Sequence, residues 1–447
     1  MNLPSYVKTA IEYLNKAGFE AYAVGGCVRD SLLLKNPDDW DLCTSAEPME
    51  ICEVFKGFHV IETGLKHGTV TVRIEHNSIE ITTFRTDGEY VDHRRPEKVL
   101  FVKNLKEDLS RRDFTINALC YNENCGIVDL FDGKNDLENK IIRCVGNAEK
   151  RFEEDALRIL RALRFSSCLG FEIEEETSKA IFNKMHLLKE ISGERIRVEL
   201  LKMLCGKGVE NVLLKYRDVL AVIIPEIKAT FDFKQNNPHH CYDVYIHIVK
   251  AVSQVNGDGN IKMVMLLHDI GKPETVSVDE KGLHHFKKHP TVSCEMASGI
   301  LNRLKFDNKS KDKILNHIFE HDNRFLAVRK SVRKFVAKYD YDFFFEHLEI
   351  RLADTLAQSE YNRDGKLYDI AEKKRIANDL IAENAQLSMK NLAIDGSVLM
   401  GEGYPEGKIL GEILKDCFEA VVEERVSNDK TELLKYVFEK YDCRRKF

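Results

Sequence analysis

Two aspartates, Asp39 and Asp41, flank the only tryptophan of the chain, Trp40. On a β-strand, residues i and i+2 share a face, so both carboxylates would point the same way, opposite to Asp38 and Trp40. Adjacent carboxylates repel each other unless a cation lies between them, and such oxygen ligands suit Mg²⁺. Glu80, on a following predicted strand, can supply a third oxygen ligand. The pair predicts a catalytic magnesium site, and aspartates that only cap a helix are the alternative.

A glycine pair precedes these aspartates, within the segment Ala23–Asp30. A strand that runs into Gly25 and Gly26 and then a helix presents backbone N–H groups at a helix N-terminus, which suits phosphate. Arg29, one turn later, adds a guanidinium. Two glycines alone are typical of any loop. Their position just before the aspartate pair favours a phosphate site instead.

A third cluster, Ser110–Ala118, combines basic, acidic and amide side chains in Arg111, Arg112, Asp113 and Asn117. Two arginines beside an aspartate and an asparagine can bind a triphosphate and a sugar hydroxyl. The alternative is a surface turn with a local salt bridge, which contributes little to stability.

Charged side chains also gather on one face of a predicted helix, namely Glu154, Asp155, Arg158 and Arg161. This spacing usually means ion pairs on a solvated face. It can also read a base, because cytosine and adenine both present an amino donor beside a ring-nitrogen acceptor. A carboxylate and an arginine match that pattern, while guanine and uracil present the inverse. One Asp–Arg pair can therefore accept CTP and ATP and reject GTP and UTP.

Two regimes of hydrophobic periodicity must position these residues. Up to about residue 146, strands are predicted, for example over Gly68–Ile74 and Ser78–Phe84, whose residues alternate with period two. His76–Asn77 between them predicts a hairpin turn.

From about residue 147 onward the period is helical. Arg151–Phe165 is predicted to be one helix with an apolar stripe, and histidines become frequent from Asn236. Pro405–Gly407 interrupts the pattern before a last amphipathic segment over 408–424.

Composition describes an ordinary globular protein of 447 residues with 43% hydrophobic residues and a net charge of −6. No apolar stretch approaches the roughly 20 residues that span a bilayer, and no secretory signal is visible, so no membrane partner is expected. The 12 cysteines form no CxxC pair, which favours reduced thiols in a cytoplasmic protein. The negative total argues mildly against nucleic acid, whereas the arginine clusters above argue for it.

In this order, the clusters resemble the class II nucleotidyltransferases, the family of CCA-adding enzymes and bacterial poly(A) polymerases. The matching segments are Gly25–Asp30, Asp39–Asp41, Arg111–Ala118 and Glu154–Arg158, with a weaker match at Glu194–Glu199. The resemblance covers residues 1–210, and the segments Asn391–Gly396 and Ile409–Leu414 are similar to the end of bacterial CCA-adding enzymes.

The resemblance implies an α+β protein in four parts. A polymerase-β-like nucleotidyltransferase head, a mixed sheet with helices, is expected over residues 1–146. An all-α neck that recognises the base follows over 147–225. An HD-type helical body is expected over 226–370 and a helical, tRNA-binding tail over 371–447.

The resemblance also implies a role for each matching residue. Asp39 and Asp41 would hold two Mg²⁺ ions, with Glu80 as a third carboxylate. The triphosphate and ribose would be bound by Gly25, Gly26, Arg29, Arg112, Asp113 and Asn117. The base would be read by Asp155 and Arg158, with support from Glu154, Arg161 and Arg164. The segment from Asp87–Tyr90 to Arg94–Pro96 is similar to the mobile loop of the family.

The expected activity is addition of C, C and A to the 3′ end of tRNA from CTP and ATP. The tRNA would be recognised by the shape and phosphates of its acceptor stem. Gly64–Thr69 is similar to the tRNA enzymes, which places poly(A) polymerase second. CC-only and A-only enzymes stay open, as does the oligomeric state.

The histidine-rich part resembles an HD domain, because His268–Asp269 follows an apolar run and precedes Ile270–Lys272. The further ligands implied by the resemblance are His247, His289, His321 and Asp354. Imidazole and carboxylate ligands suit one or two divalent transition metals that activate water for phosphoester hydrolysis. The alternative is a helical body in which these histidines and aspartates only satisfy each other's hydrogen bonds.

Overall fold

The computed structural model of the chain describes residues 1–87, 90–91, 95–96, 99–383, 385 and 387–441. Contacts divide these residues into two units. The first unit comprises Met1–Lys228 with Ile300–Phe306, and the second comprises Ala229–Gly299 with Asp307–Phe447.

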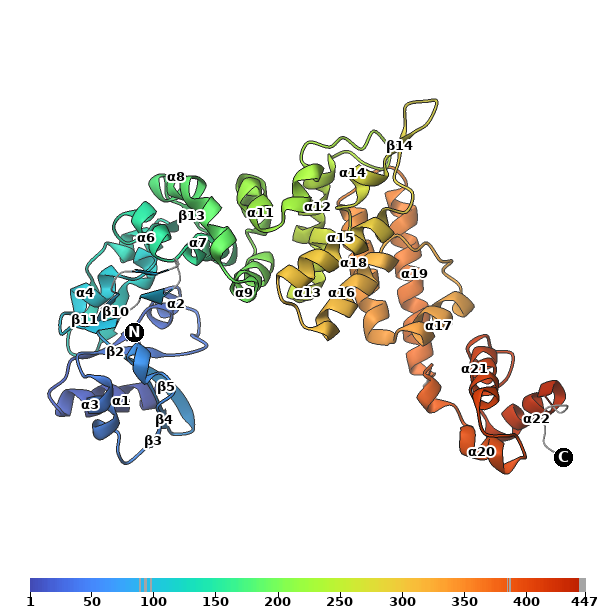
Figure 1. Cartoon of the computed structure of the whole chain (residues 1–447), viewed down its shortest axis with the longest axis horizontal. Helices are drawn as coiled ribbons and strands as arrows, with labels where there is room; N and C mark the ends of the chain where they lie inside the picture. The colour runs from blue at the N-terminus through green and yellow to red at the C-terminus, as the bar shows by residue number, and fades with distance from the viewer. Residues whose placement is uncertain (88–89, 92–94, 97–98, 384, 386, 442–447) are drawn as a thin grey trace. The chain divides into compact units, whose positions relative to one another are not determined.

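A mixed sheet of seven strands forms the core of the head, in the order β11-β10-β1-β2-β5-β4-β3 (Figure 1). Its strands are β1 Ala21–Val24, β2 Asp41–Thr44, β3 His59–Ile61, β4 Thr69–Ile74, β5 Asn77–Thr83, β10 Leu119–Asn122 and β11 Gly126–Asp129. Only β2 and β5 pair in parallel within this sheet. The predicted mixed-sheet head is thereby confirmed.

Helices α1 (Ser5–Lys16) and α3 (Pro48–Val54) cover one face of this sheet. Val7, Ala10, Ile11 and Leu14 of α1 recur at helical spacing and are buried in one cluster with the apolar residues of β2, β4 and β5. The other short elements of the head are α2 Gly26–Leu32, α4 Leu105–Ser110, α5 Gly133–Glu138, β6 Arg85–Asp87, β7 Tyr90–Val91, β8 Arg95–Pro96, β9 Val99–Phe101 and β12 Ile141–Ile142.

The hairpin between β4 and β5 turns one residue earlier than predicted. Glu75 and His76 occupy the turn with φ values of 48° and 67°, and Asn77 already pairs with Ile74. A two-residue turn with positive φ at both positions matches the twist of the strands, which explains the shift from the predicted His76–Asn77.

The helix predicted over Arg151–Phe165 is two helices, α6 (Ala148–Glu154) and α7 (Leu157–Leu169). Asp155 between them is extended, with φ −145° and ψ 102°, and its Oδ1 accepts a hydrogen bond from the backbone N–H of Leu157 at 3.1 Å. An aspartate that caps the next helix in this way ends the previous one. The apolar stripe continues through the break, which is why periodicity alone does not reveal it.

The rest of the first unit is helical. It contains α8 Glu175–Lys184, α9 Gly193–Leu204, α10 Val209–Lys215 and α11 Arg217–Ile223, with a short strand β13 at Glu172–Ile173 that pairs with β12. α7 packs against α9.

The second unit is almost entirely helical (Figure 1). Its helices are α12 Val244–Gln254, α13 Gly259–Leu267, α14 Lys272–Thr275, α15 His289–Arg303, α16 Asn308–Glu320, α17 Arg329–Lys338, α18 Tyr341–Leu356, α19 Arg363–Ala382, α20 Gly396–Gly401, α21 Lys408–Val422 and α22 Lys430–Tyr441. A two-stranded ribbon, β14 Ser277–Val278 and β15 His284–His285, completes it.

α21 matches the amphipathic segment predicted over 408–424, and α22 lies in the part of the tail that was expected to be helical. α20, α21 and α22 share a hydrophobic cluster of their own. α19 runs through residues 370–371, where the boundary between body and tail was expected. The four-part division of the chain stays a prediction. In the described part of the chain, no helix is long and apolar enough to cross a membrane.

Candidate active site and a second metal-ligand cluster

Three carboxylates lie together at the middle of the head sheet. Asp41 opens β2 and is paired in register with Glu80 of the parallel strand β5, and Asp39 precedes β2 by two residues. All three side chains are exposed, while Trp40 and Leu42 are buried in the core. The alternation predicted from the sequence therefore holds at this position.

The clustering of these carboxylates changes the pKa of Asp41. Protein atoms displace water from it, and Asp39 and Glu80 repel its charge, so that its pKa rises from 3.8 to about 6. A bound divalent cation removes this repulsion, and three carboxylates are the ligand type that hard cations prefer. The residues present fit a divalent metal ion at this place.

Gly25 and Arg112 meet at the end of β1. Gly25 has a φ of 82°, and a Cβ there would lie 3.2 Å from Nη1 of Arg112. Gly26 begins α2, and a Cβ on it would approach Arg29 Nη2 to 3.8 Å. Glycines at these two positions allow a phosphate to approach the backbone beside two guanidinium groups.

A hydrogen-bonded network holds these arginines. Arg29 is buried and donates from Nη1 to Asn117 Oδ1 at 2.6 Å, and from Nε to Asp30 Oδ1 at 2.9 Å. Asn117 in turn donates from Nδ2 to Asp113 Oδ1 at 3.0 Å. Arg161 donates from Nε to Asp113 Oδ2 at 2.8 Å. Burial opposes ionisation of Asp113, but Arg161 and the bond from Asn117 hold its pKa down at about 2.

Asp108, which the sequence analysis did not single out, lies between the two arginines of the third cluster. Its Oδ1 is 2.7 Å from Arg111 Nη2, and its Oδ2 is 3.3 Å from Arg112 Nη2. Asp108 is completely buried, which by itself would raise its pKa. Arg112 and Arg111 outweigh this effect and lower the pKa of Asp108. One buried carboxylate thus orients both arginines, which makes the turn more than a surface salt bridge.

The predicted base-reading residues lie at the joint between α6 and α7 rather than along one helix face. Arg158 is buried, donates to Glu154 Oε2 at 2.8 Å and donates to the carbonyl of Arg111 at 2.9 Å. Asp155 accepts from Arg195 Nη2 at 2.8 Å, 40 residues further along the chain. The arginine and the carboxylate therefore have separate anchors.

Arg195 and Glu199 of α9 also contribute to this network, and in the sequence they stand only within the weakly matching segment Glu194–Glu199. Glu199 is buried and lies 3.0 Å from Nε of Arg164. The ring of Phe165 lies below three guanidinium groups, with its centroid 5.1, 5.4 and 4.2 Å from the Cζ atoms of Arg29, Arg161 and Arg164. The only signal for these residues in the sequence was the Glu194–Glu199 match.

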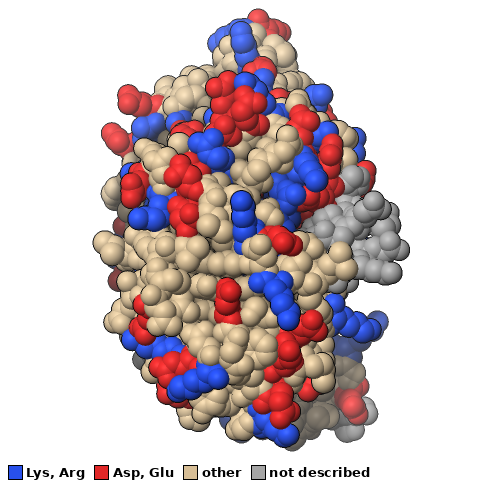
Figure 2. All heavy atoms as spheres, turned by 90° about the vertical axis from the view of Figure 1, so that its left-hand side faces the viewer, with Lys and Arg blue, Asp and Glu red and all other residues tan. Residues whose placement is uncertain are grey.

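All predicted nucleotide-binding residues thus belong to one unit and to one network of contacts. Figure 2 shows that acidic and basic side chains are interspersed on the face it presents, without a continuous basic area. Of the predicted mobile loop, residues 88, 89 and 92–94 lie outside the described residues, and the loop stays a prediction.

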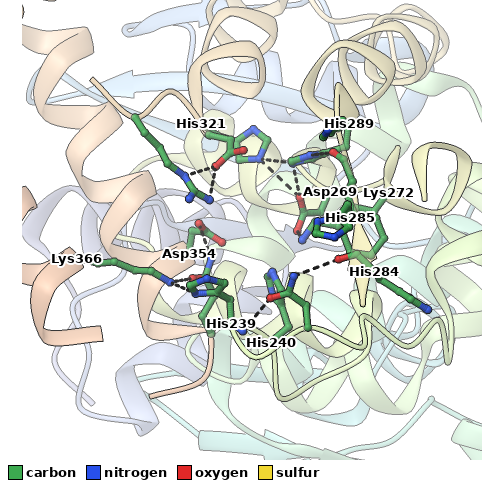
Figure 3. Close-up of a pocket in the computed structure, with 16 residues that line it drawn as sticks. His239, His240, Asp269, Lys272, His284, His285, His289, His321, Asp354 and Lys366 are labelled. Carbon is green, nitrogen blue, oxygen red and sulfur yellow. Dashed lines mark hydrogen bonds and ion pairs between the residues drawn. The ribbon is translucent and has the colours of Figure 1, made fainter. Parts of the chain in front are cut away.

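A second cluster of ligand-type side chains lies in the helical unit. The structure brings together all six residues named from the HD resemblance, and all six are buried: His247, His268, Asp269, His289, His321 and Asp354. Figure 3 shows the part of the cluster that lines a pocket. They come from α12, from the turn after α13, from the starts or ends of α15 and α16, and from α18.

Each of the four histidine rings is fixed by a hydrogen bond to the backbone. Each Nδ1 lies 2.6–3.2 Å from a backbone carbonyl, namely those of Ala357, Met265, Phe286 and Ile318. With the proton on Nδ1, each Nε2 presents a lone pair to the interior of the cluster.

These lone pairs face each other in two pairs. His247 Nε2 is 3.3 Å from His268 Nε2, and His289 Nε2 is 3.1 Å from His321 Nε2. Two unprotonated ring nitrogens would repel at this distance, so either a proton or a metal ion must lie between them. With metal–nitrogen bonds of about 2.0–2.1 Å, two ligands of one ion lie about 3 Å apart. The observed spacing fits two imidazoles on a shared cation.

The carboxylates complete two sets of ligands. Asp269 Oδ2 is 3.2 Å from Nε2 of both His247 and His268, and its Oδ1 is 3.2 Å from His289 Nε2. Asp354 Oδ1 is 3.1 Å from His247 Nε2. Burial opposes protonation, but bonds to Asp269 and Asp354 raise the pKa of His247 to about 9, so without an ion His247 carries a proton that a bound cation would replace. The donor set fits one or two divalent metal ions with Asp269 between them.

Family models match most of the chain. The family model of the poly A polymerase head domain matches residues 21–143, and that of the "Probable RNA and SrmB-binding site of polymerase A" matches residues 170–231. The model of tRNA nucleotidyltransferase domain 2 matches residues 289–437. The fold is that of a nucleotidyltransferase, a class of enzyme that uses divalent metal ions.

Relatives that match over nearly the whole chain identify the family more narrowly. A CCA-adding enzyme of Lactobacillus delbrueckii subsp. bulgaricus is 38% identical over 96% of both chains, and one of Lactobacillus johnsonii is 36% identical over 98% of both. The crystal structure of the Bacillus stearothermophilus CCA-adding enzyme in complex with CTP matches with a TM-score of 0.72 and 27% identity over 99% of both chains. A Thermotoga maritima CCA-adding enzyme complexed with tRNA shares the fold, with a TM-score of 0.56 and 21% identity over 97% of this chain and 94% of that chain. This chain belongs to the CCA-adding enzyme family.

Proposed function

We propose that this chain adds C, C and A to the 3′ end of tRNA from CTP and ATP, with the reaction at Asp39, Asp41 and Glu80. The observation that supports this most directly is the pairing of Asp41 with Glu80 in register, which gathers three repelling carboxylates beside Arg112. We assign Mg²⁺ as their ion, because oxygen-only ligands suit it.

In the proposed reaction, the 3′-hydroxyl oxygen of tRNA forms a bond to the α-phosphorus of the nucleotide. The bond between that phosphorus and the bridging oxygen of pyrophosphate breaks, and the hydroxyl proton is lost. Divalent ions, when bound, make the hydroxyl a better nucleophile and neutralise charge on the phosphates. Arg112 and Arg29 bind the triphosphate, and Gly25 and Gly26 let it approach the backbone.

Selection of the nucleotide is assigned to Asp155 and Arg158. Asp155 is held by Arg195, and Arg158 is held by Glu154. These bonds keep a hydrogen-bond acceptor and a donor in place for the base-pairing edge of C or A. Guanine and uracil would leave both groups unmatched, which costs roughly 1–3 kcal/mol for each buried polar group.

Incorporation from each of the four nucleoside triphosphates tests this proposal. The substrates are tRNAs that lack CCA, that end in CC, and that are complete. The proposal expects C, C and A only, in that order, and no extension of complete tRNA. Poly(A) tails, or a stop after CC, would assign the alternative activities instead.

Asp39→Ala and Asp41→Ala are expected to lose incorporation while tRNA binding is kept. Asp38→Ala is the matched control, because Asp38 is an exposed neighbour in the same loop. Near wild-type rates in both metal-site variants would remove these carboxylates from the chemistry. We infer a cytoplasmic location for this activity, which the free cysteines of the described part support.

The histidine cluster supports a second proposed activity, metal-dependent hydrolysis of phosphate esters, including terminal or 2′,3′-cyclic phosphates of RNA. The two short Nε2–Nε2 distances carry this proposal. In the reaction a water oxygen bonds to phosphorus, the ester bond breaks, and the leaving oxygen takes a proton. Bound divalent transition-metal ions would activate the water. Lys272, with Nζ 2.6 Å from Asp269 Oδ2, holds that carboxylate in place.

Metal content and phosphate release test this second activity together. The purified protein is expected to bind a divalent transition metal that His268→Ala loses, and to release phosphate in a reaction that His268→Ala abolishes and Asp39→Ala leaves intact. A metal-free protein that folds normally and adds CCA would make the cluster a structural one.

A further inference from the structure

Two neighbouring cavities open beside the histidine cluster. The first, of about 290 Å³, is lined by the metal-ligand residues Asp269, His289, His321 and Asp354 (Figure 3). The second, of about 270 Å³, extends from it toward α18 and α19. They share a wall made of His239, Arg324, Asp354, Gln358 and Lys366. Pockets that bury an organic ligand usually measure about 300–1,000 Å³, so each cavity alone lies just below this range and the two together fall within it.

The shared wall carries positive charge that few carboxylates balance. Lys366 points into the pocket from α19 (Figure 3) and donates to neutral partners, Gln358 Oε1 at 2.6 Å and His239 Nδ1 at 3.4 Å. Within the described residues, no carboxylate oxygen lies within 4 Å of its Nζ. Arg324 and Arg351 lie beside a single carboxylate, Asp322, at 3.1 and 3.9 Å. Burial lowers the pKa of Lys366; the carboxylate of Asp354 opposes this, and Arg324 and Arg351 add to it.

The second cavity combines these cations with surfaces suited to a nucleoside. Phe325 and Leu326 provide apolar area, and Asn362 provides amide donors and acceptors. Lys373 is already neutralised by Asp369 at 2.7 Å, so the excess charge is concentrated at Arg324, Arg351 and Lys366.

We propose that Arg324, Arg351 and Lys366 form a second anion site, so that the ligand is a nucleotide with phosphates on both its 5′ and its 3′ side. This inference rests on the proposed hydrolase, whose metal ligands would receive one of the two phosphates. The other phosphate binds the cations of the shared wall. A free nucleoside 3′,5′-bisphosphate and a 3′-phosphorylated RNA end both carry this chemistry.

Calorimetric titration of the full-length protein as purified tests the second anion site, with phosphate release measured in parallel so that heat from hydrolysis is recognised. The ligands are guanosine 3′,5′-bisphosphate and guanosine 3′-monophosphate, because the head is expected to reject guanine. The bisphosphate should bind about tenfold more tightly, since a charge-assisted contact to phosphate contributes at least that factor. Equal affinities would overturn the proposal.

Lys366→Gln is expected to reduce this preference to about twofold or less without changing the affinity for the monophosphate. Lys374→Gln on the same helix, whose side chain is 55% exposed and outside both cavities, should keep the full preference. A preference that survives in Lys366→Gln would also overturn the proposal.

Two further measurements separate the sources and the proposals. A trinucleotide with a 3′-phosphate that binds more tightly than the bisphosphate assigns an RNA end, and weaker binding assigns a free nucleotide. Metal content, measured separately, decides the hydrolase. A metal-bound protein without the bisphosphate preference refutes only the second anion site, whereas a metal-free protein with the preference refutes only the hydrolase.

Discussion

At the scale of single residues, Asp41 shows how a binding site costs stability before its ion arrives. Its carboxyl group has a pKa of about 6 in the folded chain and of 3.8 ordinarily. The folded state therefore holds the proton more firmly than the unfolded chain does. Stability contributed in this way is present at low pH and is lost as the pH rises through about 6.

Asp41→Asn removes this repulsion at every pH. In the presence of a chelator at pH 7.5, we expect the melting temperature of the variant to exceed that of the wild type by about 2 °C, a small value because the group is solvent-screened. The difference should narrow at pH 5, where the wild-type carboxyl is mostly protonated. Thermal unfolding at both pH values measures it, and a variant less stable than the wild type at pH 7.5 would contradict this account.

Arg195 is expected to act on the nucleotide through another side chain, Asp155. Its bond to Asp155 fixes the carboxylate that is assigned to the base. In Arg195→Gln, misincorporation of GTP relative to CTP should rise about tenfold, because a charge-assisted hydrogen bond of about 1.5–3 kcal/mol is lost. Single-nucleotide incorporation kinetics measure this ratio. Lys202→Gln on the exposed side of the same helix is the control, and an unchanged ratio in Arg195→Gln would dissociate Arg195 from base selection.

At the scale of elements, the turn between β1 and α2 links backbone conformation to phosphate binding. Gly25 combines a positive φ with a close approach to Arg112, whereas Gly18, at the end of α1, has a φ of 90° and no atom within 4 Å of a Cβ position. Substitution at both positions introduces backbone strain, but only substitution at Gly25 also introduces a contact with the site.

Gly25→Ala and Gly18→Ala should both lower the melting temperature, because an alanine at positive φ costs about 1–2 kcal/mol. Only Gly25→Ala should raise the KM for CTP, by about tenfold, since its methyl group displaces Arg112. Steady-state kinetics and thermal unfolding of both variants measure the effects. Equal KM values in the two variants would mean that the approach of Arg112 to Gly25 has no role in binding.

The joint at Asp155 is also fixed by contacts that are distant in the sequence. Helical periodicity predicted one helix because the apolar stripe of α6 continues into α7. The capping bond to Leu157 and the capture of the side chain by Arg195 decide the extended backbone instead. A hydrogen bond from a residue far along the chain leaves no trace in local periodicity.

At the scale of the whole molecule, charge is divided between the inside and the surface. The net charge is −6, yet Arg29 and Arg158 are buried with carboxylate partners, and acidic and basic groups are interspersed on the face shown in Figure 2. On this face, a few contacts to phosphates, rather than a large basic area, are then expected to bind tRNA.

The affinity for tRNA should therefore fall by about tenfold to a hundredfold between about 50 and 200 mM salt, as two to four phosphate contacts require. Filter binding or fluorescence anisotropy across this range measures the slope. An uncharged osmolyte at equal osmolality is the control and should leave the affinity unchanged. An affinity indifferent to salt would mean that phosphates contribute little.

The sequence by itself determined which reactive side chains stand close together along the chain: carboxylates at i and i+2, glycines before a helix, arginines beside an aspartate, and the pair His268–Asp269. These depend on residue identity and short spacing, which a linear sequence preserves. Only the tertiary structure decided that Glu80 lies opposite Asp41, that Asp108 orients two arginines, and that four Nε2 atoms converge. Each of these depends on long-range pairing of strands or helices, whose register is set by packing of the whole core rather than by any local segment.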